Sequence, residues 1–93
     1  MLPEAPIEWQ TVTVAGQEVK VRSVTYPQAV EIGKLLDAGD IVEANLVGIA
    51  YGTDTPLDEV REWSLRTTPG TVEALGRAVA DAGALTEGAN KST

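Results

Sequence analysis

Apolar and polar residues alternate along residues 7–24, with Ala15-Gly16 at the centre of the alternation. A period of two is typical of strands with one buried face, and the small central residues favour a tight hairpin turn. If Val14 pairs with Gln17 across an even-numbered loop, four valines share one face, whereas an odd-numbered loop would divide them between both faces. These valines are Val12, Val14, Val19 and Val21. We therefore predict a hairpin with a positive φ angle at Gly16, whose valine face is covered by helices or by a strand of another chain.

Helical spacing replaces this alternation after residue 24. Thr25 followed by Gln28 is typical of a capping box at the start of a helix. This helix should extend to about Ala38 and stop at Gly39, because glycine readily adopts the left-handed conformation that ends a helix. Its apolar stripe consists of Ala29, Ile32, Leu35 and Leu36.

The next segment, from Ile41 to about Tyr51, is apolar on nearly every side, and Asp40 before it is a favourable N-cap. A helix of this kind lies either at the centre of a domain or in an interface. A third helix is predicted from Thr55-Pro56 to about Arg66. Within it, Glu62 and Arg66 are four residues apart and oriented for a surface ion pair.

A fourth helix should open at Thr68-Pro69 and carry an apolar stripe to about Leu85. Gly76 and Gly83 lie in this stripe, and their cost in helix propensity indicates that another backbone approaches closely. The fold class is therefore α+β: an N-terminal β-hairpin followed by about four short helices in one domain, residues 1–85. The polar residues 86–93 have no pattern and are predicted to be a disordered tail.

The charge of the chain limits its partners. Fourteen acidic and seven basic residues give a net charge of -7, and the cations are scattered rather than gathered into a stripe. Nucleic acid is not an expected partner, because phosphate binding requires a basic footprint. The chain has no apolar run of the roughly 20 residues that a membrane helix needs, and Met1-Leu2-Pro3-Glu4 lacks the basic start of a signal peptide. We expect a cytoplasmic protein with no membrane partner.

The chain has few side chains that are suited to catalysis, since cysteine and histidine are both absent. Catalytic triads and common zinc sites are thereby excluded, so we expect no enzyme activity and no cofactor. The densest group of oxygen ligands is Asp37, Asp40, Glu43 and Asn45. Its spacing does not match a calcium loop, and helix stop and N-cap chemistry explains the aspartates without a metal.

The best candidates for contact with a partner are the two tryptophans and the apolar helix between them. Trp9 lies on the polar face of the predicted hairpin, and Trp63 lies on an otherwise charged helix. A lone tryptophan is more often a packing residue than a contact residue, but tryptophan is enriched where interfaces concentrate their binding energy. The predicted partner-binding residues are Trp9, Ile41, Val42, Leu46, Ile49 and Trp63.

Read from end to end, the chain resembles the small tail assembly chaperones of long-tailed (siphovirus-type) bacteriophages, which are encoded upstream of the tape measure protein. Ile7–Val24 is similar to the valine-rich strand pair that opens members of this family. Leu57–Trp63 looks like the family's short acidic helix. Val72–Val79 followed by Gly83–Thr86 looks like the helix that ends the domain before a polar tail.

The resemblance implies a protein that binds the long, aggregation-prone helices of the tape measure protein in the host bacterial cytoplasm. It further implies that tail tube protein subunits gather around this complex, and that the chaperone is absent from the mature virion. In many members a ribosomal frameshift near the end of the reading frame appends a domain that recruits those subunits. The family offers no catalytic residues. The valine hairpin and the glycines of the last helix also make a homo-oligomer the expected state.

Two other functions are left open. A structural virion protein, such as a head-to-tail connector or a tail subunit, would share the size and the α+β content. Its presence in purified particles would favour that function. A small acidic regulatory or inhibitor protein is the third hypothesis, and tight binding to a nuclease would favour it.

Overall fold

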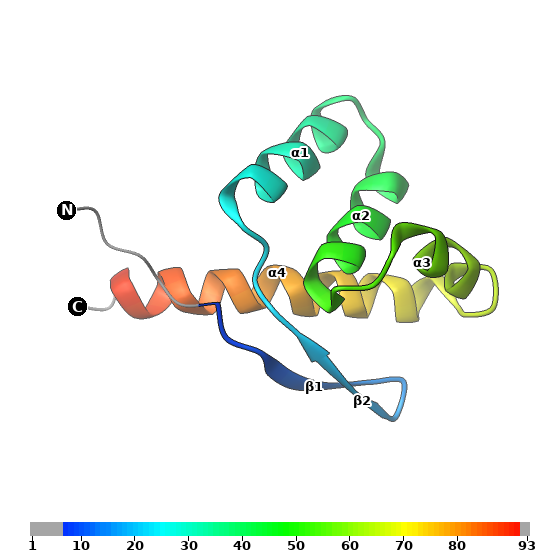
Figure 1. Ribbon diagram of the computed structural model, residues 1–93, viewed down its shortest axis with the longest axis horizontal. Coiled ribbons are helices and arrows are strands. Elements are labelled where there is room, and N and C mark those ends of the chain that lie inside the picture. Colours follow the sequence, from blue (N-terminus) through cyan, green and yellow to red (C-terminus); the bar gives the residue numbers. More distant parts are fainter. Residues whose placement is uncertain (1–6, 92–93) are drawn as a thin grey trace.

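The computed structural model describes residues 7–91, with side-chain surroundings for residues 7–82. The hairpin comes first and four helices follow it in one small domain, which confirms the predicted α+β class (Figure 1). In chain order the elements are β1 (Gln10–Val14), β2 (Gln17–Val21), α1 (Tyr26–Asp37), α2 (Ile41–Thr53), α3 (Leu57–Ser64) and α4 (Pro69–Lys91).

The hairpin has the register that the valine pattern predicted. Val14 pairs with Gln17 across a two-residue turn, and Gly16 has a φ angle of 78°. Ala15 also has a positive φ, 52°, so both turn residues are left-handed, as a type I′ turn requires. Val14 and Val21 are buried, and their face packs against α4 and α2 of the same chain. The valine face is thus covered by helices, which was one of the two predicted alternatives.

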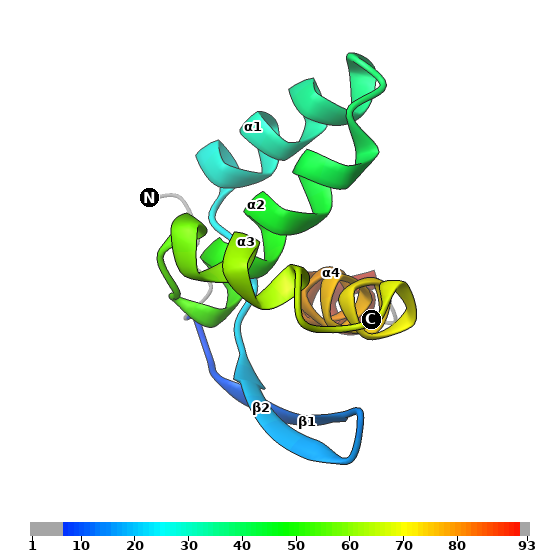
Figure 2. The same ribbon diagram turned by 90° about the vertical axis from the view of Figure 1, so that its right-hand side faces the viewer.

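The core lies where α2, α4 and the valine face meet. Figure 2 shows α4 end-on, with the hairpin below it and α2 above. Val21 and Ile49 are the large side chains that are fully buried, and burial of such a side chain contributes about 1.5–3 kcal/mol. The remaining buried cluster consists of Val14, Leu46, Ala50, Val60, Leu75 and Val79. Because α2 contacts α1, α3, α4 and β2, it is the central helix, as its all-round apolar sequence allowed.

The helix α1 lies on the outside of the molecule and packs chiefly against α2 (Figures 1 and 2). It begins at the predicted capping box, where the Thr25 backbone N–H donates to Gln28 Oε1 at 2.9 Å. It ends before Gly39, whose φ of 81° reverses the chain into α2. Not one of its twelve residues is buried. We call α1 and the first turns of α2, residues 26–45, the arm.

Glycines set the distance between α2 and α4, although not in the way that was expected. Gly76 of α4 faces the Asn45 side chain, whose Oδ1 would lie 3.5 Å from an added Cβ. The tightest approach is at Gly52 of α2, where an added Cβ would overlap the side chain of Val79. The neighbour of Gly76 is thus a side chain rather than the second backbone that was predicted there, and the neighbour of Gly52 is also a side chain. The surroundings of Gly83 lie outside the described side chains.

Three helix ends differ from the prediction. α2 continues to Thr53 instead of ending near Tyr51. α3 ends at Ser64 instead of near Arg66, because the N–H groups of Leu65 and Arg66 bond three residues back and tighten the last turn. α4 continues through Lys91, six residues into the segment predicted as a disordered tail, and this extension includes good helix formers such as Glu87 and Ala89. Residues 92–93 of that predicted tail lie outside the described residues.

Candidate functional site

The four predicted contact residues of α2 fall into two groups. Ile41 and Val42, in its first turn, are 61% and 72% exposed. Leu46 and Ile49 are 7% and 2% exposed, so their apolar surface is already used within the domain. A partner that docks on the folded chain gains little from Leu46 and Ile49, which corrects their assignment as a contact surface. The sequence did not separate the two groups because the helix is apolar on nearly every side.

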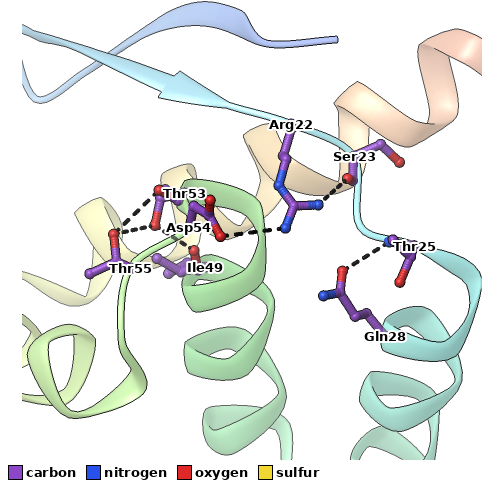
Figure 3. Close-up of polar contacts among 8 residues, drawn as sticks. All are labelled: Arg22, Ser23, Thr25, Gln28, Ile49, Thr53, Asp54 and Thr55. Carbon is purple, nitrogen blue, oxygen red and sulfur yellow. Dashed lines mark hydrogen bonds and ion pairs between the residues drawn. The ribbon is translucent and has the colours of Figure 1, made fainter. Parts of the chain in front are cut away.

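Trp9 contacts Arg22, which connects the hairpin to the end of α2. Its half-exposed ring lies 6.0 Å from the guanidinium of Arg22, within the range of a cation–π contact. Arg22 also forms an ion pair with Asp54 at the end of α2, at 3.7 Å (Figure 3). The Arg22 backbone N–H donates to the Gly52 carbonyl at 2.8 Å. These contacts give Trp9 a role within the chain, while half of its surface stays available.

The outward side of α1 is apolar and uncovered. Tyr26 and Val30 are one helical turn apart, and both are exposed, as is Leu36 near the end of the helix. The opposite side, with Ile32 and Leu35, is partly buried toward α2. Exposed apolar side chains, Ile41 and Val42, also occur in the first turn of α2, which follows the end of α1 in the chain. We call this surface the arm face, and it consists of Tyr26, Ala29, Val30, Leu36, Ile41 and Val42.

Sequence reasoning missed the part of the arm face that lies on α1. It assigned Ala29 and Leu36 to the inward stripe of the helix, whereas both are exposed. The sequence did contain a sign of this exposed side, because apolar residues occupy two sides of α1. A helix that packs against a single neighbour can bury only one of them.

Two polar contacts hold α1 and α3 on α2. The Tyr51 hydroxyl donates a hydrogen bond to the Glu31 carboxylate, and this bond raises the pKa of Tyr51 above its ordinary value. On the other side, Arg61 of α3 bonds Glu43 Oε2 at 2.6 Å. That hydrogen bond raises the pKa of Arg61 above its ordinary value.

A second candidate surface is a groove of about 860 Å³ between the hairpin tip, α3 and the first turns of α4. This volume lies in the range of about 300–1,000 Å³ that is typical of ligand sites. Trp63, which is partly buried, lines the groove from α3. The other large apolar lining residues are Val14, Val19, Ile49, Val60 and Leu75. Ala15 and eight polar residues complete the lining, the polar ones being Gln17, Thr53, Thr55, Glu59, Glu62, Arg66, Thr67 and Thr71.

The charges of the groove lie along α3. Glu62 and Arg66 do not form the ion pair that their spacing predicted, because α3 ends at Ser64 and the helical geometry does not extend to Arg66. Within the described side chains, the ion pairs are Arg22 with Asp54 and Arg61 with Glu43. Glu59 and Glu62 therefore have no cation partner in that part of the chain.

The residues weighed as metal ligands are not brought together. Across residues 7–82, no group of three or more acidic side chains is arranged to hold a metal ion. Asp40 takes the N-cap position of α2 instead, and Glu43 is engaged by Arg61. Over the described part of the chain, no helix combines the length and the apolarity that a membrane crossing requires.

Comparisons of the chain with protein-family models, curated proteins and solved structures find no match. The features of the chain that bear on its function are therefore its two surfaces, the arm face and the groove, and the order of elements along the sequence.

Proposed function

We propose that this protein is a tail assembly chaperone of a long-tailed bacteriophage. In this proposal it binds apolar helices of the tape measure protein in the host cytoplasm, before the tail tube protein surrounds them, and it is absent from the mature virion. The observation that carries the proposal is the arm face, because large apolar side chains on a helix that buries none of its own residues are suited to hold another helix.

A partner helix laid along α1 would complete a helix layer that the chain leaves open. Ile41 and Val42 expose most of their surface, and burial of one such side chain contributes roughly 1.5–3 kcal/mol before the cost of association. A few such contacts are enough for reversible binding. Reversible binding suits a chaperone, which must release its client when the tube subunits arrive.

The charge around the arm face supports the same function. Asp37 and Asp40 are exposed beside the apolar tip of the arm, and the whole chain carries a charge of -7. Acidic residues around an apolar patch favour clients that carry basic residues, and the net charge keeps a complex with an apolar client soluble. In this proposal copies of the chain also associate with one another, and an extended form of the chain recruits the tail tube protein.

Co-expression with an insoluble tape measure fragment tests the proposal. The wild-type protein should carry the fragment into the soluble fraction, whereas the double variant Ile41→Ser/Val42→Ser should leave it insoluble. Leu65→Ser is a matched control, because Leu65 is 85% exposed and lies outside the arm face. Each replacement is at the surface, so thermal unfolding should show that both variants remain folded.

Two results would count against the function. If the arm variant solubilises the fragment as well as the wild type does, the arm face is not the binding surface. If the wild type leaves the fragment insoluble and mass spectrometry finds the chain in purified particles, a structural virion protein is the better description.

A further inference from the structure

The groove is a surface of its own, separate from the arm face, and the proposed function does not use it. It opens between the hairpin tip and the start of α4, whereas α1 lies on the far side of α2 (Figures 1 and 2). We propose that the groove is a second binding site, and that its occupant is an amphipathic helix whose apolar row is flanked by basic residues.

The lining of the groove suits an apolar row of side chains. Its large apolar side chains that stay partly open are Trp63 on α3 and Val19 on β2, whereas the lining residues Val60 and Leu75 are buried in the core. Tryptophan is among the residues that contribute most to binding energy at interfaces. Trp63 is partly buried within the domain, and the rest of its side chain is accessible to a partner. A volume of about 860 Å³ has room for several aliphatic side chains of a partner.

The flanking charges select a basic partner. Glu59 and Glu62 are three residues apart on α3, both are exposed, and neither has a cation partner within the described side chains. Arg66, beyond the end of α3, is the cation of the lining. Two free carboxylates against one guanidinium, in a chain of charge -7, attract lysine or arginine beside the apolar row of the occupant.

A helix fits this groove better than an added strand. The hairpin contributes side chains of its inner face, such as Val14 and Val19, rather than the free backbone groups of a strand edge. A strand would need those backbone groups as hydrogen-bond partners, whereas a helix satisfies its own backbone and offers only side chains.

Two designed peptides test the site. The first is a 16-residue helix of leucine and alanine with lysine on both flanks of the leucine row. The second, a control peptide, has the same sequence with glutamate at every lysine position. The chain has two tryptophans, so its nitrogen–proton spectrum contains two indole signals, which a Trp9→Phe variant assigns. The lysine peptide should move the Trp63 signal and leave that of Trp9 in place, because Trp9 does not line the groove.

Charge reversal on α3 identifies the groove as the site. Glu59→Lys/Glu62→Lys should weaken binding of the lysine peptide by about tenfold or more and favour the glutamate peptide. The control Glu73→Lys/Asp81→Lys changes the net charge equally at exposed positions of α4 outside the groove, and it should bind nearly as well as the wild type.

Several results would overturn the inference: an unmoved Trp63 signal at saturating lysine peptide, equal binding of both peptides, or equal weakening by the two charge reversals. The arm variant Ile41→Ser/Val42→Ser separates this inference from the proposed function. It should bind the lysine peptide at Trp63 as the wild type does, even where it fails to solubilise a tape measure fragment. A loss of that peptide signal in the arm variant would show that the groove is not an independent site.

Discussion

Alanine replacement of two glycines in the same helix should change stability in opposite directions. Gly48 and Gly52 both lie in α2, and neither has a positive φ angle. A Cβ at position 48 would lie 3.7 Å from Ile32 Cδ1, an ordinary van der Waals distance. A Cβ at position 52 would overlap the Cβ and both Cγ atoms of Val79 in α4. The two replacements are thus alike in chemistry and differ in packing.

The expected sizes follow from helix propensity and from overpacking. Alanine in place of glycine inside a helix stabilises by about 0.8–1.0 kcal/mol, and Gly48→Ala should gain most of this. Gly52→Ala must also move α4 or Val79, and overpacking of this kind costs about 1–3 kcal/mol. The unfolding free energies of the two variants should therefore differ by about 1–3 kcal/mol, with a separation in Tm of about 4–8 °C for each kcal/mol.

Urea unfolding, followed by circular dichroism at 222 nm, measures this difference. A third protein, Gly52→Ala/Val79→Ala, removes both Cγ atoms that the new methyl group meets. The cost of Gly52→Ala should fall by about 1 kcal/mol or more in the Val79→Ala background, as a double-mutant cycle would show. The packing argument is refuted if Gly52→Ala is as stable as Gly48→Ala, or if its effect is the same in both backgrounds.

The hairpin turn and the bond between α1 and α2 give two further predictions. Ala15→Asn should stabilise the protein by about 0.5–1 kcal/mol, because asparagine tolerates the left-handed conformation that precedes Gly16; a lower Tm would contradict the type I′ assignment. In a Tyr26→Phe background, which leaves Tyr51 as the one tyrosine, Glu31→Gln should lower the pKa of Tyr51 in absorbance titrations at 295 nm. Since folding raises that pKa, the bond to Glu31 adds stability below pH ~10, and this contribution disappears as pH rises through the folded-state pKa; an unchanged titration in Glu31→Gln would refute the contact.

The register of the hairpin was predictable because a loop has either an even or an odd number of residues, and the two cases place the valines differently. A loop with an even number of residues puts Val12 and Val19 opposite each other on one face. A loop with an odd number would turn some of the valines toward water. The central position of α2 was one of two predicted alternatives for the same kind of reason, since a helix without a polar side must be surrounded by other structure. In both cases the residues themselves exclude most arrangements.

The helix contacts were less predictable because they depend on distances between elements that are far apart in sequence. The sequence indicated a close approach at Gly76, within an apolar stripe, yet the closest approach occurs at Gly52, just beyond the predicted end of the second helix near Tyr51. Trp63 was identified as a contact candidate from its charged surroundings. The groove that it lines depends on how the hairpin tip sits against α3 and α4, and no local pattern encodes that placement.

The exposed apolar residues of α1 are distinct from the buried residues that form the core of the domain. Beyond its first turn, α2 is surrounded by the hairpin, α3, α4 and the inner side of α1, and the outer side of α1 stays exposed. Its apolar residues add little to the free energy of folding, whereas truncation of a core residue such as Ile49 to alanine would cost about 2–5 kcal/mol. In the proposed function, the exposed Val30 and Leu36 contact the partner helix instead. If the proposed function holds, substitutions in the arm face should change partner binding while the fold stays intact.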